Sequence, residues 1–456
     1  MTLTCFKAYD VRGQLDTEIT ENIVYRIGRA FGQLTNAKRI AIGGDARATS
    51  ESLKQAAIKG LLDAGVDAID IGMTGTEEVY FAAFHLDVEG GIEITASHNP
   101  IDYNGMKFVG KGATPIVGED LQKIHDLAES QKFIETSKSG ALSKQSILID
   151  YVNHLLGYIN LDGITPLKLV VNAGNGAAGH VIDAIEEIFN KQGVPIEFIK
   201  IHHAPDPTFP NGIPNPILPE NQVATSEAIK KHNAHMGIAW DGDFDRCFLF
   251  DEKGTFVDGY YVVGLLAAAF LKKSPGEKII HDPRLVWNTI EITEQHGGKA
   301  IQAKTGHAFL KQRMRDENAM YGGEMSAHHY FRDFAYCDSG MIPWLLVTEL
   351  MCQTKLPLSK LVSSRIEAFP CSGERNFKVR DAQGAIDAVC AYFKEQEDQP
   401  MIDATDGTSM SFSQWRFNIR SSNTEPLLRV NVETRGDKEL VVKKTNLIAS
   451  IIQKHE

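Results

Sequence analysis

Cysteines are few in this chain, and they form no recognisable motif. The 456 residues include six Cys, and no two of them form a CxxC pair. Scattered cysteines are typical of reduced thiols, and they argue against a disulfide framework. A chain of this length can bury a large core without covalent cross-links. We therefore expect a globular protein that does not depend on disulfides.

Positive charge and long apolar runs are also scarce. Asp and Glu outnumber Lys and Arg by 59 to 47, which gives a formal net charge of -12. This balance argues against a general nucleic-acid or anionic-membrane surface, because such surfaces need clustered Lys and Arg. The longest apolar stretch, 262–271, is too short to span a bilayer and indicates a buried helix. The first residues lack a basic segment followed by an apolar one, so we expect a cytoplasmic protein without a secretory signal.

Strand and helix patterns alternate along most of the chain, which predicts α/β layers. The first such patterns lie at 39–44, 50–65, 66–72, 77–86 and 90–97. Ser50 and Gly65 are suitable residues for the two ends of the first helix. A second series begins at 167, and the last 90 or so residues contain strand patterns typical of an antiparallel sheet. The predicted domains are 1–145, 146–250, 251–366 and 367–456.

A serine follows the strand pattern that ends the first series. Ser97 lies in TASHNP (95–100), beside His98, and Lys107 follows ten residues later. The carboxyl end of a sheet strand is where α/β folds place ligands, and a serine can act as a nucleophile when a base or a metal activates it. Lys107 could accept a proton or contact a phosphate. A simple turn before the proline is the alternative interpretation.

Three carboxylates lie two residues apart in DGDFDR (241–246), directly after an apolar strand pattern. In an extended loop Asp241, Asp243 and Asp245 would project to one side. Like charges held this close would each tend to bind a proton, and a hard divalent cation would remove that conflict. Oxygen ligands suit Mg²⁺. We therefore predict a metal site here, in preference to a solvated acidic turn.

Polar residues alternate in YGGEMSAHHYF (321–331). Glu324, Ser326 and His328 could share one face of an extended segment and offer donors and acceptors to sugar hydroxyls. A polar surface strand would show the same alternation. The spacing alone leaves both interpretations open.

Donor groups are crowded in RSSNTEPLLR (420–429). An arginine fork, two serine hydroxyls, an amide and a threonine hydroxyl lie within five residues, beside backbone N–H groups. This set suits a phosphate, although a polar hairpin turn is the structural alternative.

A glycine motif between a strand pattern and a helix pattern has two explanations. Gly174, Gly176 and Gly179 form GxGxxG, and Glu197 lies near the end of the next strand pattern. This is formally a dinucleotide-binding fingerprint. A tight strand-to-helix turn explains the glycines equally well, and a nicotinamide site would leave the acidic loop and the serine segment unexplained. We therefore favour the turn.

Together these segments resemble the α-D-phosphohexomutase superfamily, in its phosphomannomutase/phosphoglucomutase branch. The resemblance covers essentially the whole chain, and its motifs occur in the family's order. They are KAYDVRG (7–13), TASHNP (95–100), YNGMK (103–107), DGDFDR (241–246), KTGH (304–307), GEMSAH (323–328) and RSSNTEP (420–426). The resemblance implies an α/β fold with three similar α/β domains, each with a mixed, mostly parallel sheet. A C-terminal α+β domain would complete the fold, and the four domains would surround a central cleft.

The resemblance also implies roles for individual residues. Ser97 would carry the phosphoryl group, and with its phosphate Asp241, Asp243 and Asp245 would hold one Mg²⁺ per chain. The implied catalytic residues are Ser97, His98, Lys107 and Arg246. The implied substrate-binding residues are Tyr9, Arg12, Arg284, His307, Glu324, Ser326, His328, Arg420, Ser422, Asn423, Thr424 and Arg429. Relatives often have Lys at the position of Arg284, so a planar fork replaces a point-like ammonium there.

The implied reaction interconverts mannose 6-phosphate and mannose 1-phosphate through a hexose 1,6-bisphosphate, which is intermediate and activator. It would supply GDP-mannose for surface polysaccharide, with phosphoglucomutase activity as a possible addition. The expected partners are small hexose phosphates, without nucleic acid or membrane, for a monomer or weak homodimer. A metal-dependent phosphatase, a nicotinamide oxidoreductase and a non-catalytic sugar-phosphate binding protein are the alternatives. Ser97 and the complete Asp triad argue against the last, because binding alone needs neither.

Overall fold

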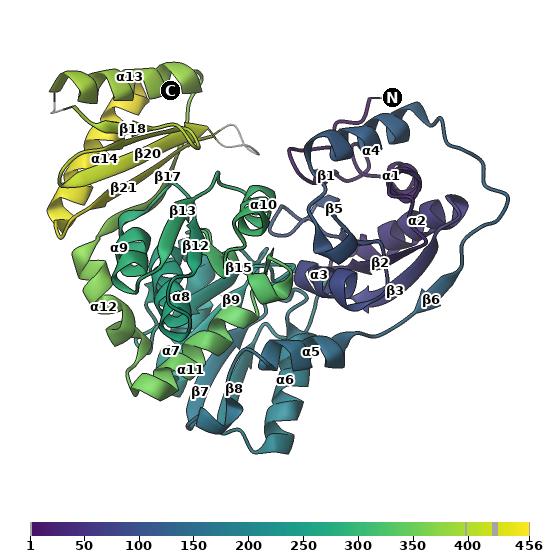
Figure 1. Cartoon of the computed structure of the whole chain (residues 1–456), viewed down its shortest axis with the longest axis horizontal. Helices are drawn as coiled ribbons and strands as arrows, with labels where there is room; N and C mark the ends of the chain where they lie inside the picture. Colours follow the sequence, from purple (N-terminus) through teal and green to yellow (C-terminus); the bar gives the residue numbers. More distant parts are fainter. Residues whose placement is uncertain (1, 397–398, 422–426, 456) are drawn as a thin grey trace. The chain divides into compact units, whose positions relative to one another are not determined.

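The computed structural model of the chain describes residues 2–396, 399–421 and 427–455 (Figure 1). Two compact units divide the chain. The first unit contains Met1–Val257 and His328–Leu358, and the second contains Asp258–Ala327 and Ser359–Glu456. Each unit has its own group of buried polar residues.

A six-stranded mixed sheet opens the first unit, in the order β1-β5-β4-β2-β3-β6. Its strands are β1 (Val11–Gln14), β2 (Arg39–Gly44), β3 (Asp67–Met73), β4 (Gly90–Ile94), β5 (Tyr103–Gly110) and β6 (Leu142–Lys144). β2 pairs in parallel with β3 and β4, whereas β5 pairs antiparallel with β4 and β1. The strands predicted at 39–44, 66–72 and 90–97 are confirmed, and β5 and β1 add an antiparallel edge.

Helices cover this sheet and supply much of its core. They are α1 (Glu21–Leu34), α2 (Ser50–Asp63), α3 (Thr76–His85) and α4 (Gly118–Ser130). Phe31 of α1 and Leu61 of α2 are completely buried, and they belong to one hydrophobic core with Ile42 and Ile92 of the sheet. At about 25 cal/mol per Å² of apolar surface, burial of this kind is the main term that holds such a layer together.

The predicted start of the first helix needs a correction. Thr49, not Ser50, is the N-cap residue of α2. The Ser50 hydroxyl instead donates a hydrogen bond to Asp45 Oδ1 at 2.6 Å, because that carboxylate is buried and needs donors. Gly65 follows the helix with a φ of +80°, a conformation that suits glycine.

A second sheet of the first unit has the order β11-β10-β9-β7-β8. Its strands are β7 (Leu167–Asn172), β8 (Ile196–Ile201), β9 (Met236–Trp240), β10 (Cys247–Phe250) and β11 (Phe256–Val257), and its helices are α5 (Leu148–Leu156), α6 (Gly179–Gln192) and α7 (Pro219–His232). β7 pairs in parallel with β8 and β9, so the loops after β7 and β9 leave the sheet at the same edge.

The glycine motif after β7 supports the acidic loop after β9. A Cβ at Gly176 would lie 2.7 Å from the carbonyl oxygen of Gly242, and the Ala177 N–H donates to that oxygen at 3.1 Å. A Cβ at Gly174 would lie 2.3 Å from the ring of Pro214, in the proline-rich loop. The close approach of these backbones explains the glycines, as the turn interpretation expected.

The last part of the first unit contains β15 (His329–Phe331), β16 (Cys337–Asp338) and α11 (Ile342–Thr354). Glu77 of α3 binds the segment before α11. Its buried carboxylate accepts hydrogen bonds from the Ser339 hydroxyl at 2.9 Å, the Tyr151 hydroxyl and the Gly340 N–H. The Trp240 indole donates to the Gly340 carbonyl at 2.9 Å. This segment therefore connects α3 with the end of β9, directly before the acidic loop.

In the second unit, β12 (Lys278–His281) pairs in parallel with β13 (Lys299–Gln302) and β14 (Tyr321–Gly323). The associated helices are α8 (Gly259–Lys273), α9 (Trp287–Gln295), α10 (His307–Glu317) and α12 (Leu358–Ala368). α8 contains the apolar stretch 262–271, which was predicted to be a buried helix. In the part of the chain that the structure describes, every helix is too short or too polar to cross a membrane.

The chain ends in an antiparallel sheet of order β17-β21-β20-β19-β18, as predicted for the last 90 residues (Figure 1). Its strands are β17 (Cys371–Lys378), β18 (Met401–Asp403), β19 (Thr408–Ser411), β20 (Trp415–Ser421) and β21 (Leu427–Thr434). Apolar residues of β20 and β21 form one core with α13 (Ala382–Gln396) and α14 (Lys438–Ile452). The alternate residues on these strands form a buried polar face, which consists of Arg416, Asn418, Arg420, Asn431 and Glu433.

Candidate functional site

Ser97 follows β4 in a strained conformation. Its φ is +50°, in the left-handed region that non-glycine residues rarely adopt. The Ser97 hydroxyl donates to Asp241 Oδ2 at 2.9 Å and lies 3.1 Å from His98 Nδ1. Strain of this kind persists where the surroundings enforce it, and it is common at functional sites. The predicted serine is thus joined to the predicted acidic loop, 144 residues away.

The acidic loop forms a turn, not the extended segment assumed in the sequence analysis. The N–H of Phe244 donates to the Asp241 carbonyl at 3.1 Å, and Phe244 has a φ of +44°. The turn still brings Asp241, Asp243 and Asp245 together, with a carboxylate oxygen of each within 4.8 Å of the others. All three are at most 1% exposed. We call these three aspartates, with Ser97, Lys107 and Arg246, the acidic centre.

In each carboxylate of the acidic centre, one oxygen accepts hydrogen bonds and the other has no hydrogen-bond partner among the described residues. Lys107 Nζ donates to Asp243 Oδ2 at 2.7 Å and to Asp245 Oδ2 at 2.6 Å. Arg246 Nε donates to Asp241 Oδ2 at 2.8 Å. The three Oδ1 atoms are buried and have no hydrogen-bond partner among the described residues. Buried unpartnered carboxylate oxygens are costly, and the set fits a hard divalent cation.

Burial and charge pull the pKa values of this centre in opposite directions. Burial raises the pKa of Asp245 to about 6, and the neighbouring Asp243 carboxylate adds to the effect. Burial also disfavours the charged form of Asp243, but Lys107 outweighs it and lowers the pKa of that carboxyl. Burial opposes the charge of Lys107, but the two carboxylates raise its pKa above the usual value. Lys107 is therefore a cation here and not a proton acceptor.

His98 is kept neutral by its surroundings. Burial lowers the pKa of His98 well below its usual value, and Arg246 lowers it further. The Arg246 guanidinium also contacts His98 Nδ1 directly. The structure therefore brings the four predicted catalytic residues into one group: Ser97, His98, Lys107 and Arg246.

Arg47 belongs to this region, although the sequence analysis did not identify it. It is 5% exposed and lies between β2 and α2. Its guanidinium donates to four carbonyl oxygens of the loop that carries Ser97, at 2.9 Å for Ser97, 2.6 Å for Asn99, 2.8 Å for Pro100 and 3.1 Å for Tyr103. A buried fork of donors fixes the backbone of a loop in this way. Its only sequence signal is an Asp-x-Arg after a strand, which is weak.

Thr76 is a second residue that sequence reasoning missed. Its hydroxyl donates to Asp243 Oδ2 at 2.6 Å, and its N–H donates to the Asp243 carbonyl at 3.1 Å. A Cβ at Gly75 would lie 2.2 Å from the ring of Phe244. The first turn of α3 thus supports the acidic loop from another domain.

Three predicted substrate-binding residues lie in the first unit. Arg12 donates to Asn99 Oδ1 at 2.7 Å and pairs with Asp10 at the same distance. Tyr9 is half-buried. Burial opposes the charge of Arg12, but Asp10 and, less strongly, Tyr9 raise the pKa of its guanidinium. His328 Nδ1 lies 2.8 Å from Asp338 and 3.9 Å from Asp245.

The segment 324–327 forms a turn, so the extended strand predicted from its alternation is wrong. β14 ends at Gly323, and Ala327 has a φ of +71°, which is not an extended conformation. Glu324 and Ser326 still meet, because both contact Arg284. The Arg284 Nη2 atom lies 3.4 Å from Glu324 Oε1 and 3.2 Å from Ser326 Oγ. His307, at the start of α10, follows Gly306, whose N–H donates to Glu324 Oε1 at 3.1 Å.

Three arginines of the second unit surround one carboxylate. Glu374 Oε2 lies 3.5 Å from Arg284 Nη1 and 3.2 Å from Arg420 Nη2, and Glu374 Oε1 lies 3.6 Å from Arg429 Nε. We call these four residues the basic cluster. Arg284, Arg420 and Arg429 were predicted to bind substrate, whereas Glu374 was not identified. Ser422, Asn423 and Thr424, also predicted here, lie outside the described residues.

The loop that carries Arg284 is held by the buried polar face of the last sheet. Arg416 donates to the carbonyl oxygens of Arg284 and Pro283, at 2.9 Å in each case. Glu433, which is fully buried, accepts from the Val286 N–H at 2.7 Å and from Arg416 at 2.9 Å. These contacts fix the position of the Arg284 backbone from β20 and β21.

Family models match nearly the whole chain in four parts. Phosphoglucomutase/phosphomannomutase alpha/beta/alpha domains I, II and III match residues 4–135, 149–254 and 258–369, and the C-terminal domain matches residues 374–443. The fold therefore has four domains, three with mixed sheets and a C-terminal one with an antiparallel sheet, as predicted.

Curated relatives are similar over their full length. A phosphomannomutase of Salmonella typhimurium is 59% identical over 453 residues, with 99% of each chain covered. A phosphomannomutase of Vibrio cholerae is 57% identical over 459 residues, with the same coverage. A Xanthomonas campestris protein named "Phosphohexose mutases" is 52% identical over 454 residues, covering 99% of this chain and 100% of the relative.

Solved structures share the fold. A phosphoglucomutase/phosphomannomutase family protein of Burkholderia thailandensis superposes with a TM-score of 0.89 at 29% identity, covering 100% of this chain and 98% of the other. Parafusin, a phosphoglucomutase of Paramecium, superposes with a TM-score of 0.79 at 16% identity, covering 99% and 96%.

Proposed function

This chain belongs to the phosphoglucomutase/phosphomannomutase family, and we propose that it is a phosphomannomutase that interconverts mannose 6-phosphate and mannose 1-phosphate. The observation that supports this most is the convergence of Ser97 with three buried carboxylates in the acidic centre. A binding protein would need neither the strained serine nor the unpartnered oxygens. The names of relatives at 57% and 59% identity agree with the proposal.

The reaction passes a phosphoryl group through Ser97. Phosphorylated Ser97 gives the group to the free hydroxyl of a hexose monophosphate, so the bond from Ser97 Oγ to phosphorus breaks and a bond to the sugar oxygen forms. The hydroxyl proton has to pass to a group that is not already protonated, and we assign this role to His98, which is kept neutral beside the acidic centre. The resulting hexose 1,6-bisphosphate then returns its other phosphate to Ser97. Such transfers depend on positioning and on charge neutralisation, which Arg246 and Lys107 supply.

We infer that the metal is Mg²⁺, one per chain. Asp241, Asp243 and Asp245, with the phosphate on Ser97, would hold it through oxygen ligands, which Mg²⁺ prefers. When bound, the ion neutralises charge that develops on the transferring phosphoryl group.

The basic cluster would bind the phosphate that does not react, since guanidinium forks match phosphate oxygens. Ser422, Asn423 and Thr424 are proposed to contribute to the same site on the family resemblance alone. Glu324 and Ser326, together with His307 and His328, would contact sugar hydroxyls. We place the reaction in the cytoplasm, where its product would supply GDP-mannose for surface polysaccharide.

The deciding experiment is an isomerisation assay. Purified protein receives mannose 1-phosphate, Mg²⁺ and a trace of hexose 1,6-bisphosphate, with glucose 1-phosphate in a parallel reaction. We expect mannose 6-phosphate without free phosphate, and loss of the reaction when a chelator removes the metal. Activity restored by Mg²⁺ would identify the ion.

Other outcomes would change the assignment. Release of free phosphate as the main product would make the protein a phosphatase. Faster turnover of glucose 1-phosphate would make glucose the preferred sugar, because the two substrates differ only in the C2 hydroxyl. Absence of reaction with either sugar would reject the proposal.

A further inference from the structure

We propose that Glu374 is the resident counter-ion of the basic cluster, and that a substrate phosphate must displace its carboxylate from the arginines in order to bind. The inference rests on the proposed function, because it assigns Arg284, Arg420 and Arg429 to a phosphate of the substrate. It adds an affinity-determining residue to that site.

The strand register forces the arginines together. Arg420 of β20 lies directly opposite Arg429 of β21, and like charges in this position repel. Burial lowers the pKa of Arg420, and Arg284 lowers it further. An anion between the guanidiniums relieves this repulsion. Glu374 takes that place from β17, where it pairs with Asn431, two residues from Arg429.

The negative charges around the basic cluster disfavour phosphate binding while the Glu374 carboxylate remains on the arginines. In the described part of the chain, three guanidiniums face four carboxylates, which belong to Asp282, Glu324, Glu374 and Asp406. A phosphate monoester carries a charge of about -1.5 to -2 at pH 7. Adding it to a group that already has excess negative charge costs free energy, so a carboxylate has to leave.

Glu374 is the carboxylate best able to leave. The backbone holds two of the others: Asp282 accepts from the Met325 N–H at 2.9 Å, and Glu324 accepts from the Gly306 N–H at 3.1 Å. Among the described residues, the recorded ion-pair partners of Glu374 are all arginines. Its side chain is 20% exposed, whereas those of Asp282, Glu324 and Asp406 are at most 9% exposed.

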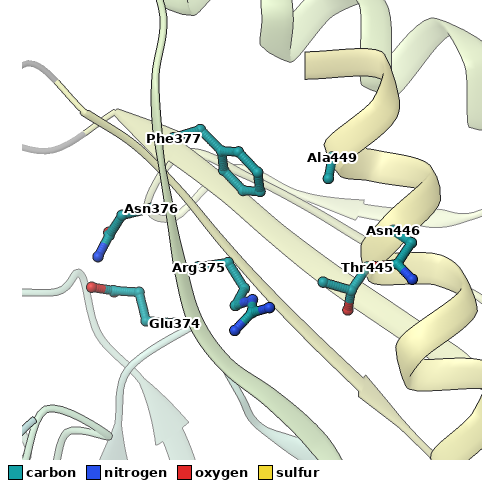
Figure 2. A pocket seen from close by; sticks show the side chains of 7 residues that line it. All are labelled: Glu374, Arg375, Asn376, Phe377, Thr445, Asn446 and Ala449. Carbon is teal, nitrogen blue, oxygen red and sulfur yellow. The ribbon is translucent and has the colours of Figure 1, made fainter. Parts of the chain in front are cut away.

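The position of Glu374 at a sheet edge gives its side chain access to solvent. β17 is an edge strand, with an irregular register between Cys371 and Glu374. Glu374 lines a hollow of about 290 Å³ between β17 and α14. Figure 2 shows Glu374 and Asn376 on one side of β17, and Arg375 and Phe377 on the side of α14. The Glu374 side chain therefore points away from this hollow. Because it belongs to an edge strand and is 20% exposed, the carboxylate can turn from the arginines toward solvent.

A counter-ion that returns suits a reaction with a bisphosphate intermediate. Both phosphates have to use the basic cluster in turn, so each must leave it within one turnover. Three guanidiniums without a counter-ion would bind a phosphate tightly, which slows release and gains nothing in the chemical step. Glu374 offsets the charge of the cluster as the phosphate leaves and so keeps the affinity moderate.

The test compares three variants of the full chain. Glu374→Gln removes the charge and keeps the shape, and Glu374→Asp draws the carboxylate back from the arginines. Glu395→Gln removes the same charge from an exposed position on α13 and is the matched control. Inorganic phosphate is titrated into each protein by calorimetry with a chelator present, so that the acidic centre repels the anion. kcat and KM for mannose 1-phosphate are measured with Mg²⁺.

We expect Glu374→Gln to bind inorganic phosphate about tenfold more tightly, which corresponds to one lost repulsive contact. Its KM and kcat should both fall, because release slows. Glu374→Asp should shift the affinity in the same direction by less, and it decides the question if Glu374→Gln does not fold. Unchanged or weaker binding in Glu374→Gln would overturn the inference. The titration needs no turnover, so tighter binding by an inactive protein would retain the inference and reject the mutase.

Discussion

The acidic centre of the first unit brings like negative charges together, whereas the basic cluster of the second unit brings like positive charges together, and the two compensate these charges differently. In the acidic centre, Lys107 and Arg246 neutralise one oxygen of each aspartate and leave the other without a partner among the described residues. In the basic cluster, Glu374 contacts all three arginines. On the proposed function, the first arrangement would keep oxygen ligands available for a fixed ion, whereas the second would already contain a substitute for its phosphate ligand.

The two regions also differ in what holds them. Buried groups of three elements fix the acidic centre: Arg47 after β2, Thr76 in α3 and the glycine turn after β7. The basic cluster contains a side chain that is 20% exposed on an edge strand. Rigid positioning suits bond making, and exchangeable contacts suit a ligand that enters twice. The comparison teaches that one reaction can require both kinds of site.

The largest effect should come from removing the nucleophile. Ser97→Ala should lower kcat at least about 10⁴-fold, since no other group can carry the phosphoryl group. Titration with mannose 1-phosphate should show nearly unchanged affinity, because the basic cluster is intact. Phosphorylation of the wild-type serine is read by mass spectrometry after incubation with hexose 1,6-bisphosphate. Retained turnover in the variant would exclude a covalent role for Ser97.

A smaller effect should follow from loosening the loop that carries Ser97. Arg47→Lys keeps the charge but cannot donate to four carbonyl oxygens at once, so the serine loses its fixed position. We expect kcat to fall about 10²-fold while KM changes little, because a shift of roughly 1 Å at a reacting atom has this cost. Arg39→Lys, at an exposed ion pair with Asp87, is the control. A change confined to KM would contradict the positioning role.

The smallest effect, and the sharpest contrast, concerns pH. Burial lowers the pKa of His329 in the first unit to about 3, and burial raises the pKa of Asp258 in the second unit to about 6. The unfolded chain therefore binds more protons at His329, so this site loses stability as pH falls below about 6.5. Asp258 has the opposite sign: its contribution is present at low pH and is lost as pH rises through about 6.

Hydrogen exchange can read both sites separately. Between pH 6.5 and 4.5, after correction for intrinsic rates, we expect protection to fall in β15 and to rise in the first turn of α8. The limit is about 1.4 kcal/mol per pH unit for each group. Asp258→Asn should remove the trend in α8 and leave β15 unchanged. Equal trends in both segments would show that these two groups do not control the local stability.

The sequence predicted the elements and residues that depend on local patterns. Strands β2, β7 and β9 have apolar runs ending in glycine or acidic loops, and TASHNP and DGDFDR each contain the groups that their chemistry needs. Local patterns failed where a partner far along the chain decides the conformation. Ser50 is not a cap because Asp45 takes its hydroxyl, and 324–327 turns where the alternation predicted a strand.

The residues that support the site were beyond sequence reasoning for a related reason. Arg47 lies 50 residues before Ser97, and Glu374 lies 90 residues after Arg284. Neither has a neighbour in sequence that indicates its role, since a single Arg or Glu in a loop is usually solvated. Only the pairing of strands brings these groups to their partners. Motifs therefore predicted the groups that we propose to react, and the fold identified the residues that hold them.

The hydrogen bonds between the last sheet and the Arg284 loop limit which domains can be exchanged between related proteins. Arg416 and Glu433 supply hydrogen bonds to the backbone at Arg284, Pro283 and Val286. A hybrid gene that joins this C-terminal domain to the third domain of a distant relative would have to preserve that fit. Recombination is therefore expected to succeed when the Arg284 loop and the last sheet come from the same parent. The loop and the sheet depend on each other although they belong to different matched domains, 258–369 and 374–443.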